Sequence, residues 1–140
     1  MAKRSWVFLV AGLVLGAGLQ WTHAEGAAPG GKVYEIRTYH TLPGRLEALN
    51  KRFREHTMKL FEKHGMSNVG YWVPQDSPAH DNTLIYVISH ASREQAKANW
   101  AAFVADPEWK KVAEDSQKDG KIIDRIESVF VDATDYSPLK

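Results

Sequence analysis

The 140-residue sequence contains no cysteine, so neither a disulfide nor a Cys-His zinc cluster can brace the fold. It also lacks a run of about 20 apolar residues, the length that a membrane-spanning helix needs. No dense basic stretch, glycine-rich phosphate loop, nucleophile elbow or paired-carboxylate motif is present. These absences argue against hydrolase, kinase and zinc-enzyme functions, and burial of apolar side chains must supply the stability.

The N-terminal segment 1–24 has the pattern of a cleaved export signal. A short basic start precedes a glycine-containing apolar run over residues 6–19, and residues 22–24 supply small side chains that suit a signal peptidase. No cysteine follows the run, so a lipoprotein anchor is excluded, and an uncleaved anchor is the alternative. We therefore expect a periplasmic or secreted protein with no stable membrane anchor after signal cleavage.

Removal of the signal changes the charge of the chain. The signal contains two of the 18 basic residues and none of the 17 acidic ones, which leaves a net charge of about −1. A nearly neutral chain without basic runs is not expected to bind nucleic acid. We expect residues 25–32, rich in glycine and alanine, to be a flexible lead-in, and residues 33–140 to form one domain.

The hydrophobic pattern predicts alternating strands and helices. Apolar residues recur at helical spacing over residues 45–64, with Gly65 as the terminating residue. Ser92 and Gln95 have the spacing of a capping box, and the pair Asp106-Pro107 interrupts and restarts the second helix. Runs of β-branched and aromatic residues predict strands at about 33–40, 66–73, 83–90 and 121–132.

This element order, βαββαβ, is the split-βαβ arrangement. The predicted fold class is α+β, ferredoxin-like, with a four-stranded antiparallel sheet and both helices on one face. We expect the first strand to be central, parallel to the third and antiparallel to the fourth. The other face of the sheet would be bare and must be covered. A homodimer that packs two such faces together is the expected solution.

Three short motifs give the chain a family resemblance. They are Tyr-Glu-x-Arg-x-Tyr at residues 34–39, a Pro-Gly turn at 43–44 and Asp-Pro-Glu-Trp at 106–109. Together they resemble the NIPSNAP family of the dimeric α+β barrel superfamily, over about residues 33–139. The resemblance implies fold and dimerisation rather than a catalytic motif. Superfamily relatives include cofactor-free monooxygenases and haem enzymes, but many carry His and Trp on the third strand, where this chain has Tyr86 and Ile88.

The strand VYEIRTYH, residues 33–40, places Glu35, Arg37 and Tyr39 on one face. A buried arginine must be paired, so we expect Glu35, or Glu127 from the fourth strand, to neutralise Arg37. If that pairing leaves donors free, the guanidinium would anchor a carboxylate or enolate ligand. If the pairing is complete, the ion pair is structural.

Tyrosines and histidines supply the other candidate site residues. Tyr71 and Tyr86, if they share the open face with Tyr39, would line a pocket for a small aromatic or amphipathic molecule, or a wet dimer interface. His40 and His90 end the first and third strands, which are expected to run parallel, so they could meet at one rim of the sheet. Either is a candidate haem ligand and His90 also a candidate for ligand binding, although lone histidines are more often structural.

The sequence thus predicts an exported homodimer that binds a small aromatic or amphipathic molecule in a pocket at the sheet. No cofactor and no metal are expected. The alternatives are a cofactor-independent monooxygenase or isomerase, a haem-binding enzyme, and a purely structural role in protein interaction.

Overall fold

The computed structural model describes residues 32–139, and four strands within them form a single sheet. The strand order is β2-β3-β1-β4, and every neighbouring pair is antiparallel. This confirms the predicted α+β, ferredoxin-like fold class. The strands are β1 (Val33–Thr41), β2 (Ser67–Trp72), β3 (Thr83–His90) and β4 (Ile123–Val131).

The expected parallel pairing of the first and third strands is wrong. β1 pairs with β3 antiparallel, with Val33 opposite His90 and His40 opposite Thr83. The reason is topological. The helical crossover brings β2 back parallel to β1, and the β2-β3 connection then reverses the chain. β3 lies between β1 and β2 and therefore runs against both.

The first helical segment is continuous but contains a π-helical turn. Thr57 Oγ1 donates a hydrogen bond to the carbonyl of Arg52 at 3.2 Å, within that turn. Gly65 ends the segment with φ of +77°, as the sequence predicted. Its parts are α1 (Leu46–Arg52), the π-helix η1 (Phe53–Thr57) and α2 (Met58–Lys63).

The second helical segment begins and restarts at the predicted residues. Ser92 Oγ accepts a hydrogen bond from the Gln95 backbone N–H at 3.0 Å, and Asp106 Oδ1 accepts one from the Glu108 N–H at 2.8 Å. These caps begin α4 (Arg93–Ala105) and α5 (Pro107–Asp115). A short helix, α3 (Ala79–Asn82), lies between the second and third strands, where the sequence predicted no helix.

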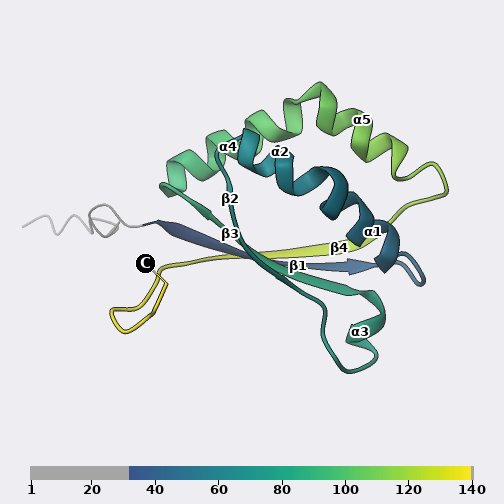
Figure 1. Cartoon of the computed structure of the whole chain (residues 1–140), viewed down its shortest axis with the longest axis horizontal. Helices are drawn as coiled ribbons and strands as arrows, with labels where there is room; N and C mark the ends of the chain where they lie inside the picture. Colours follow the sequence, from purple (N-terminus) through teal and green to yellow (C-terminus); the bar gives the residue numbers. More distant parts are fainter. Residues whose placement is uncertain (1–31, 140) are drawn as a thin grey trace, which may run out of the picture.

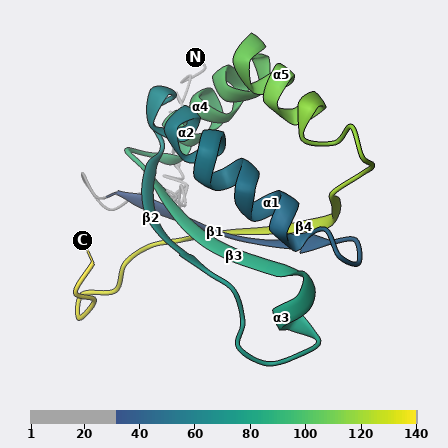
Figure 2. The same cartoon turned by 45° about the vertical axis from the view of Figure 1, so that its right-hand side comes forward.

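The long helices all lie against one face of the sheet, as Figures 1 and 2 show from two sides. The core fills the space between these helices and the sheet, and aromatic rings dominate it. Its most buried members include Leu49, Phe53, Phe61, Tyr86, Ile88 and Phe103. Among residues 32–139, no helix covers the opposite face, which we call the open face.

Residues 1–31, which include the predicted export signal and nearly all of the predicted lead-in, lie outside the described residues. Within residues 32–139, no helix has both the length and the apolar character needed to cross a membrane.

Candidate functional site

Most of the candidate site residues lie together on the helix-covered face of the sheet. Strand register places Arg37 opposite Tyr86 on β3 and opposite Ser128 on β4. Tyr71 pairs with Tyr86, and their rings stack at 5.3 Å with an interplanar angle of 17°. The three tyrosines therefore do share one face, but the condition that it be the open face is not met, because the helices pack against the face that carries Tyr39.

Glu35 is the centre of a buried hydrogen-bond network. Its side chain is 1% exposed, and its carboxylate accepts hydrogen bonds from Arg37 Nη1 at 2.6 Å and from Ser128 Oγ at 2.7 Å. Trp100 Nε1 donates a hydrogen bond to the other carboxylate oxygen, Oε2, at 2.7 Å, and Nε2 of His90 lies 3.1 Å from Oε2. Because a carboxylate only accepts, Nε2 of His90 carries the hydrogen.

These donors determine the ionisation of Glu35. Burial alone would raise its pKa, but the hydrogen bonds from His90, Ser128, Trp100 and Arg37 outweigh burial and lower the pKa from 4.5 to about 2. Glu35 is therefore a carboxylate throughout the physiological pH range. With four donors around it, the carboxylate acts as a positioning and charge-balancing group, not as a general acid.

Arg37 is paired within the chain, and its partner is Glu35 and not Glu127. Its guanidinium also lies 4.4 Å from the ring centre of Trp100, and Nη2 is 3.4 Å from the Tyr39 hydroxyl. Burial would lower the pKa of Arg37, but Tyr39, Tyr86 and Glu35 together raise it. The shortest hydrogen bond of Arg37 is thus the one to Glu35. This is the structural ion pair, one of the two interpretations that the sequence allowed.

Glu127 lies apart from the pair that Tyr39 and Tyr86 form. Glu127 is opposite Thr38 on the open face, where it lies 3.2 Å from His40 Nε2. The Tyr86 hydroxyl donates to the Tyr39 hydroxyl at 3.1 Å in the core. Burial, the largest cause, raises the pKa of Tyr86 well above its ordinary value, so the Tyr86 hydroxyl stays neutral.

His40 and His90 do not meet. Antiparallel pairing puts them at opposite ends of the sheet, so the expected shared rim is wrong. The side chain of His90 is fully buried against Glu35, while His40 is half-buried beside Glu127. Haem ligation by either histidine stays a prediction. Among residues 32–139, no group of three or more side chains has the arrangement of a metal site.

A groove lies between the first helical segment and the edge strand β2. We call it the β2 groove. It has a volume of about 410 Å³. Its walls are mostly apolar, with Tyr71 as the one candidate site residue among them, and Asn50 and Arg54 as its polar members. The lining residues are Asn50, Phe53, Arg54, Met58, Tyr71, Trp72, Val73 and Leu84.

Sequence reasoning missed several of these residues. Trp100 was not among the candidates, yet its indole N–H donates a hydrogen bond to Glu35. Ser128 could have been found from strand register alone, since it faces Arg37 across β1 and β4. Phe53 and Met58 belong to the predicted helix, but the π-helical turn between them gave no recognisable sequence signal. Such turns occur frequently at functional sites.

Comparisons with known proteins agree on one family. Residues 34–138 match the sequence model of the NIPSNAP family. A crystal structure of a NIPSNAP family protein of unknown function from Agrobacterium tumefaciens superposes with a TM-score of 0.69 at 24% identity, covering 80% of this chain and 96% of that one. A NIPSNAP-like domain protein from Burkholderia xenovorans gives 0.67 at 17% identity, covering 79% and 93%.

A more distant structural neighbour has a described activity. SnoaB from Streptomyces nogalater, a cofactor-independent oxygenase, superposes with a TM-score of 0.51 at 13% identity, covering 77% of this chain and 98% of that one. At this identity the likeness extends to the fold alone. The search of curated proteins gave no match.

Proposed function

The chain belongs to the NIPSNAP family, and from that premise we propose that it is an exported homodimer that binds a small aromatic or amphipathic molecule in the β2 groove. The proposal combines three parts: the groove as ligand site, the open face as dimer interface, and the N-terminal export pattern as the basis for a periplasmic or secreted location.

The lining of the β2 groove carries the ligand proposal. Phe53 and Tyr71 present aromatic rings whose centres are 5.7 Å apart, and Met58 and Leu84 add flexible and branched apolar surface. Arg54 is exposed at the groove, where it can meet a polar end of the ligand. An apolar concave surface with a few polar groups is the usual composition of a small-molecule site.

The open face carries the dimer proposal. Across three neighbouring strands Val87, Ile36 and Val129 form one apolar row, because Ile36 pairs with the other two. Val129 is 53% exposed in the single chain. An uncovered apolar sheet face of this kind is a typical association surface, and a second copy offers an identical face.

The ligand proposal predicts an effect of Met58→Gln. This replacement keeps the side-chain length but puts an amide in the apolar wall, so it should weaken binding of the neutral aromatic probe N-phenyl-1-naphthylamine by about tenfold. Titration followed by probe fluorescence measures the effect. Lys59→Gln, on the adjacent exposed position, is the control. Equal affinity of wild type and Met58→Gln would exclude the β2 groove as the probe site.

The dimer proposal predicts an effect of Val129→Arg. A guanidinium buried without a partner between two sheets costs several kcal/mol, so the dimer dissociation constant should rise by about a hundredfold or more. Sedimentation equilibrium over a range of concentrations measures it. Val104→Arg makes the same change on the exposed side of α4, where Val104 is 58% exposed, and should leave the dimer intact. A wild type that is monomeric at all concentrations contradicts the proposal.

Catalysis is the second candidate function. The observation in its favour is the Tyr39–Tyr86 hydroxyl pair beside Arg37, which puts polar groups in a buried, water-poor environment. A cofactor-independent monooxygenase or isomerase could use such groups to orient a phenolic substrate. Oxygen uptake with a hydroquinone, in the absence of added metal, distinguishes turnover from binding. A Soret band on haem addition that disappears in His40→Ala or His90→Ala would instead favour the haem alternative.

A further inference from the structure

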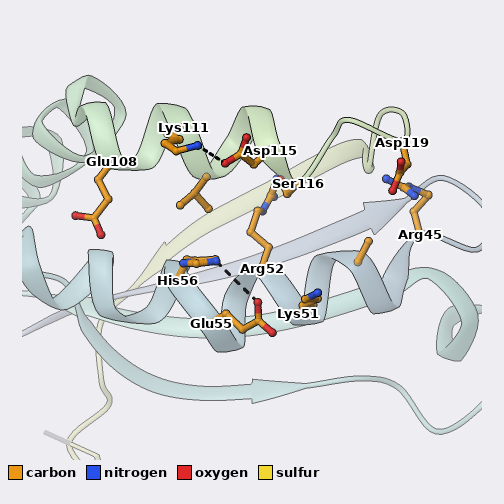
Figure 3. Close-up of a pocket in the computed structure, with 12 residues that line it drawn as sticks. Arg45, Lys51, Arg52, Glu55, His56, Glu108, Lys111, Asp115, Ser116 and Asp119 are labelled. Atoms are coloured by element: carbon orange, nitrogen blue, oxygen red, sulfur yellow. Dashed lines mark hydrogen bonds and ion pairs between the residues drawn. The ribbon is translucent and has the colours of Figure 1, made fainter.

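A second concave site lies on the other side of the first helical segment, between α1 and α5. We call it the α1–α5 cleft. It has a volume of about 510 Å³, larger than the β2 groove, and shares none of the groove's lining residues. Figure 3 shows Arg52 extending from α1 between the two helices toward Ser116, which follows α5. The cleft plays no part in the proposed function above.

Arg52 is a buried cation without a carboxylate partner among the described residues. The residue is 5% exposed, and its one hydrogen bond, from Nη1 to Ser116 Oγ, is long at 3.4 Å. Nε is buried and has no hydrogen-bond partner, and the guanidinium lies 5.3 Å from the ring centre of Trp109. Burial lowers the pKa of Arg52, opposed only by the phenols Tyr39 and Tyr86. A buried arginine is otherwise nearly always paired.

Two further cations of the cleft also lack an acidic partner among residues 32–139. Arg45 donates only to the backbone carbonyl of Gly120, at 3.0 Å, and its Nε is buried without a partner. Lys51 lines the cleft without an ion pair within 4 Å. Together with Arg52, they give the α1 side three positive charges that this part of the chain does not neutralise.

Most acidic side chains of the cleft already have a basic partner. Asp115 is 2.7 Å from both Lys111 and Lys118. Glu108 is paired with Lys63 at 3.1 Å, and Glu55 lies 3.9 Å from His56 Nε2. Asp119 is the remaining carboxylate of the lining. The cleft therefore combines unpaired cations on one wall with acids that limit how much negative charge a ligand can bring.

We propose that the α1–α5 cleft binds a small organic monocarboxylate whose carboxylate pairs with Arg52. The planar guanidinium fork matches a carboxylate, and the unpartnered Nε is one of its donors. Ala48 and Val112 add apolar surface beside the charged groups, which suits an organic body. A single negative charge fits better than a phosphate dianion, because the acidic residues of the same cleft repel the second charge.

The test is isothermal titration calorimetry of the purified protein at low ionic strength, with sodium benzoate, sodium hexanoate and inorganic phosphate as separate probes. We expect saturable binding of at least one monocarboxylate, weakened about tenfold or more in Arg52→Met, because a charge-assisted hydrogen bond is lost. Lys59→Met removes a positive charge from an exposed position of the same helical segment, outside both concave sites, and should bind as the wild type does. Met58→Gln should also leave carboxylate binding unchanged, which separates this site from the β2 groove.

Three results would overturn the proposal. They are the absence of saturable binding by either monocarboxylate, tighter binding of phosphate than of both carboxylates, and equal binding by wild type and Arg52→Met. If Arg52→Met does not fold, as judged by circular dichroism, the combined variant Arg45→Gln/Lys51→Gln takes its place. Both side chains belong to the cleft, and their removal should weaken carboxylate binding by at least about threefold. Unchanged carboxylate binding in that combined variant would also overturn the proposal.

Discussion

Replacing Glu35 by Gln is expected to lower the free energy of unfolding by about 3 to 5 kcal/mol. The substitution removes the only carboxylate that pairs with Arg37 in the described part of the chain, and it leaves the guanidinium largely buried without charge compensation. It also weakens the acceptor for Ser128 and Trp100. Urea denaturation at pH 7, followed by far-ultraviolet circular dichroism, measures the difference.

Two further variants show whether charge compensation is the cause. Glu114→Gln removes a carboxylate from an exposed position of α5 and should change the unfolding free energy by no more than about 0.5 kcal/mol. The double variant Glu35→Gln/Arg37→Met removes both charges, and it should be more stable than Glu35→Gln alone, since an apolar replacement of a buried ion pair is often tolerated. A double variant that is less stable than the single one would contradict this explanation.

Acidification is expected to destabilise the protein through the same carboxylate. The pKa of Glu35 is about 2 in the folded chain and 4.5 ordinarily, so the unfolded state binds more protons between these values. Stability from this group is complete above about pH 5 and is lost as the pH falls toward 2, a change of about 3 kcal/mol. Urea midpoints at pH 7, 4 and 2.5 measure the loss.

Other carboxylates also contribute to acid unfolding, so the comparison must isolate Glu35. Hydrogen bonds from Lys63, His64 and the Glu108 backbone hold the pKa of Asp106 far below its usual value. The Glu35→Gln variant retains these contributions but lacks that of Glu35. The stability gap between wild type and variant should therefore shrink as the pH falls from 5 to 2.5. A gap that is independent of pH would show that the charge of Glu35 does not account for it.

Because Arg37 is paired with Glu35, we expect a ligand to bind elsewhere than at this guanidinium. The sequence drew attention to the strand at residues 33–40, and the hydrogen bonds of that strand are directed mainly inward. The two concave sites lie instead on either side of the helical segment that contains the π-helical turn. Arg52 and Phe53 are neighbours in sequence, yet they line different sites, because successive helical residues point in different directions.

The sequence contains a signal for the α1–α5 cleft in the position of Arg52. Arg52 lies three residues after Leu49 and four before His56, on the same side of a predicted amphipathic helix. A charged residue in an apolar stripe is a signal worth following, since it must be paired, hydrated or directed at a ligand. The lack of a carboxylate partner for Arg52 among residues 32–139 depends on how α5 packs beside α1, which the sequence does not show.

The element order, the helix ends at Ser92, Asp106 and Gly65, and the α+β fold class are all predictable from the sequence. Those features depend on local chemistry: side-chain caps, backbone conformation and the period of apolar residues. The direction of β3, the separation of His40 from His90, and the face of the sheet that carries the tyrosines became known from the three-dimensional arrangement of the elements. These depend on how a crossover and a strand reversal combine and on which side the helices pack, and such long-range pairing leaves no mark in any single stretch of sequence.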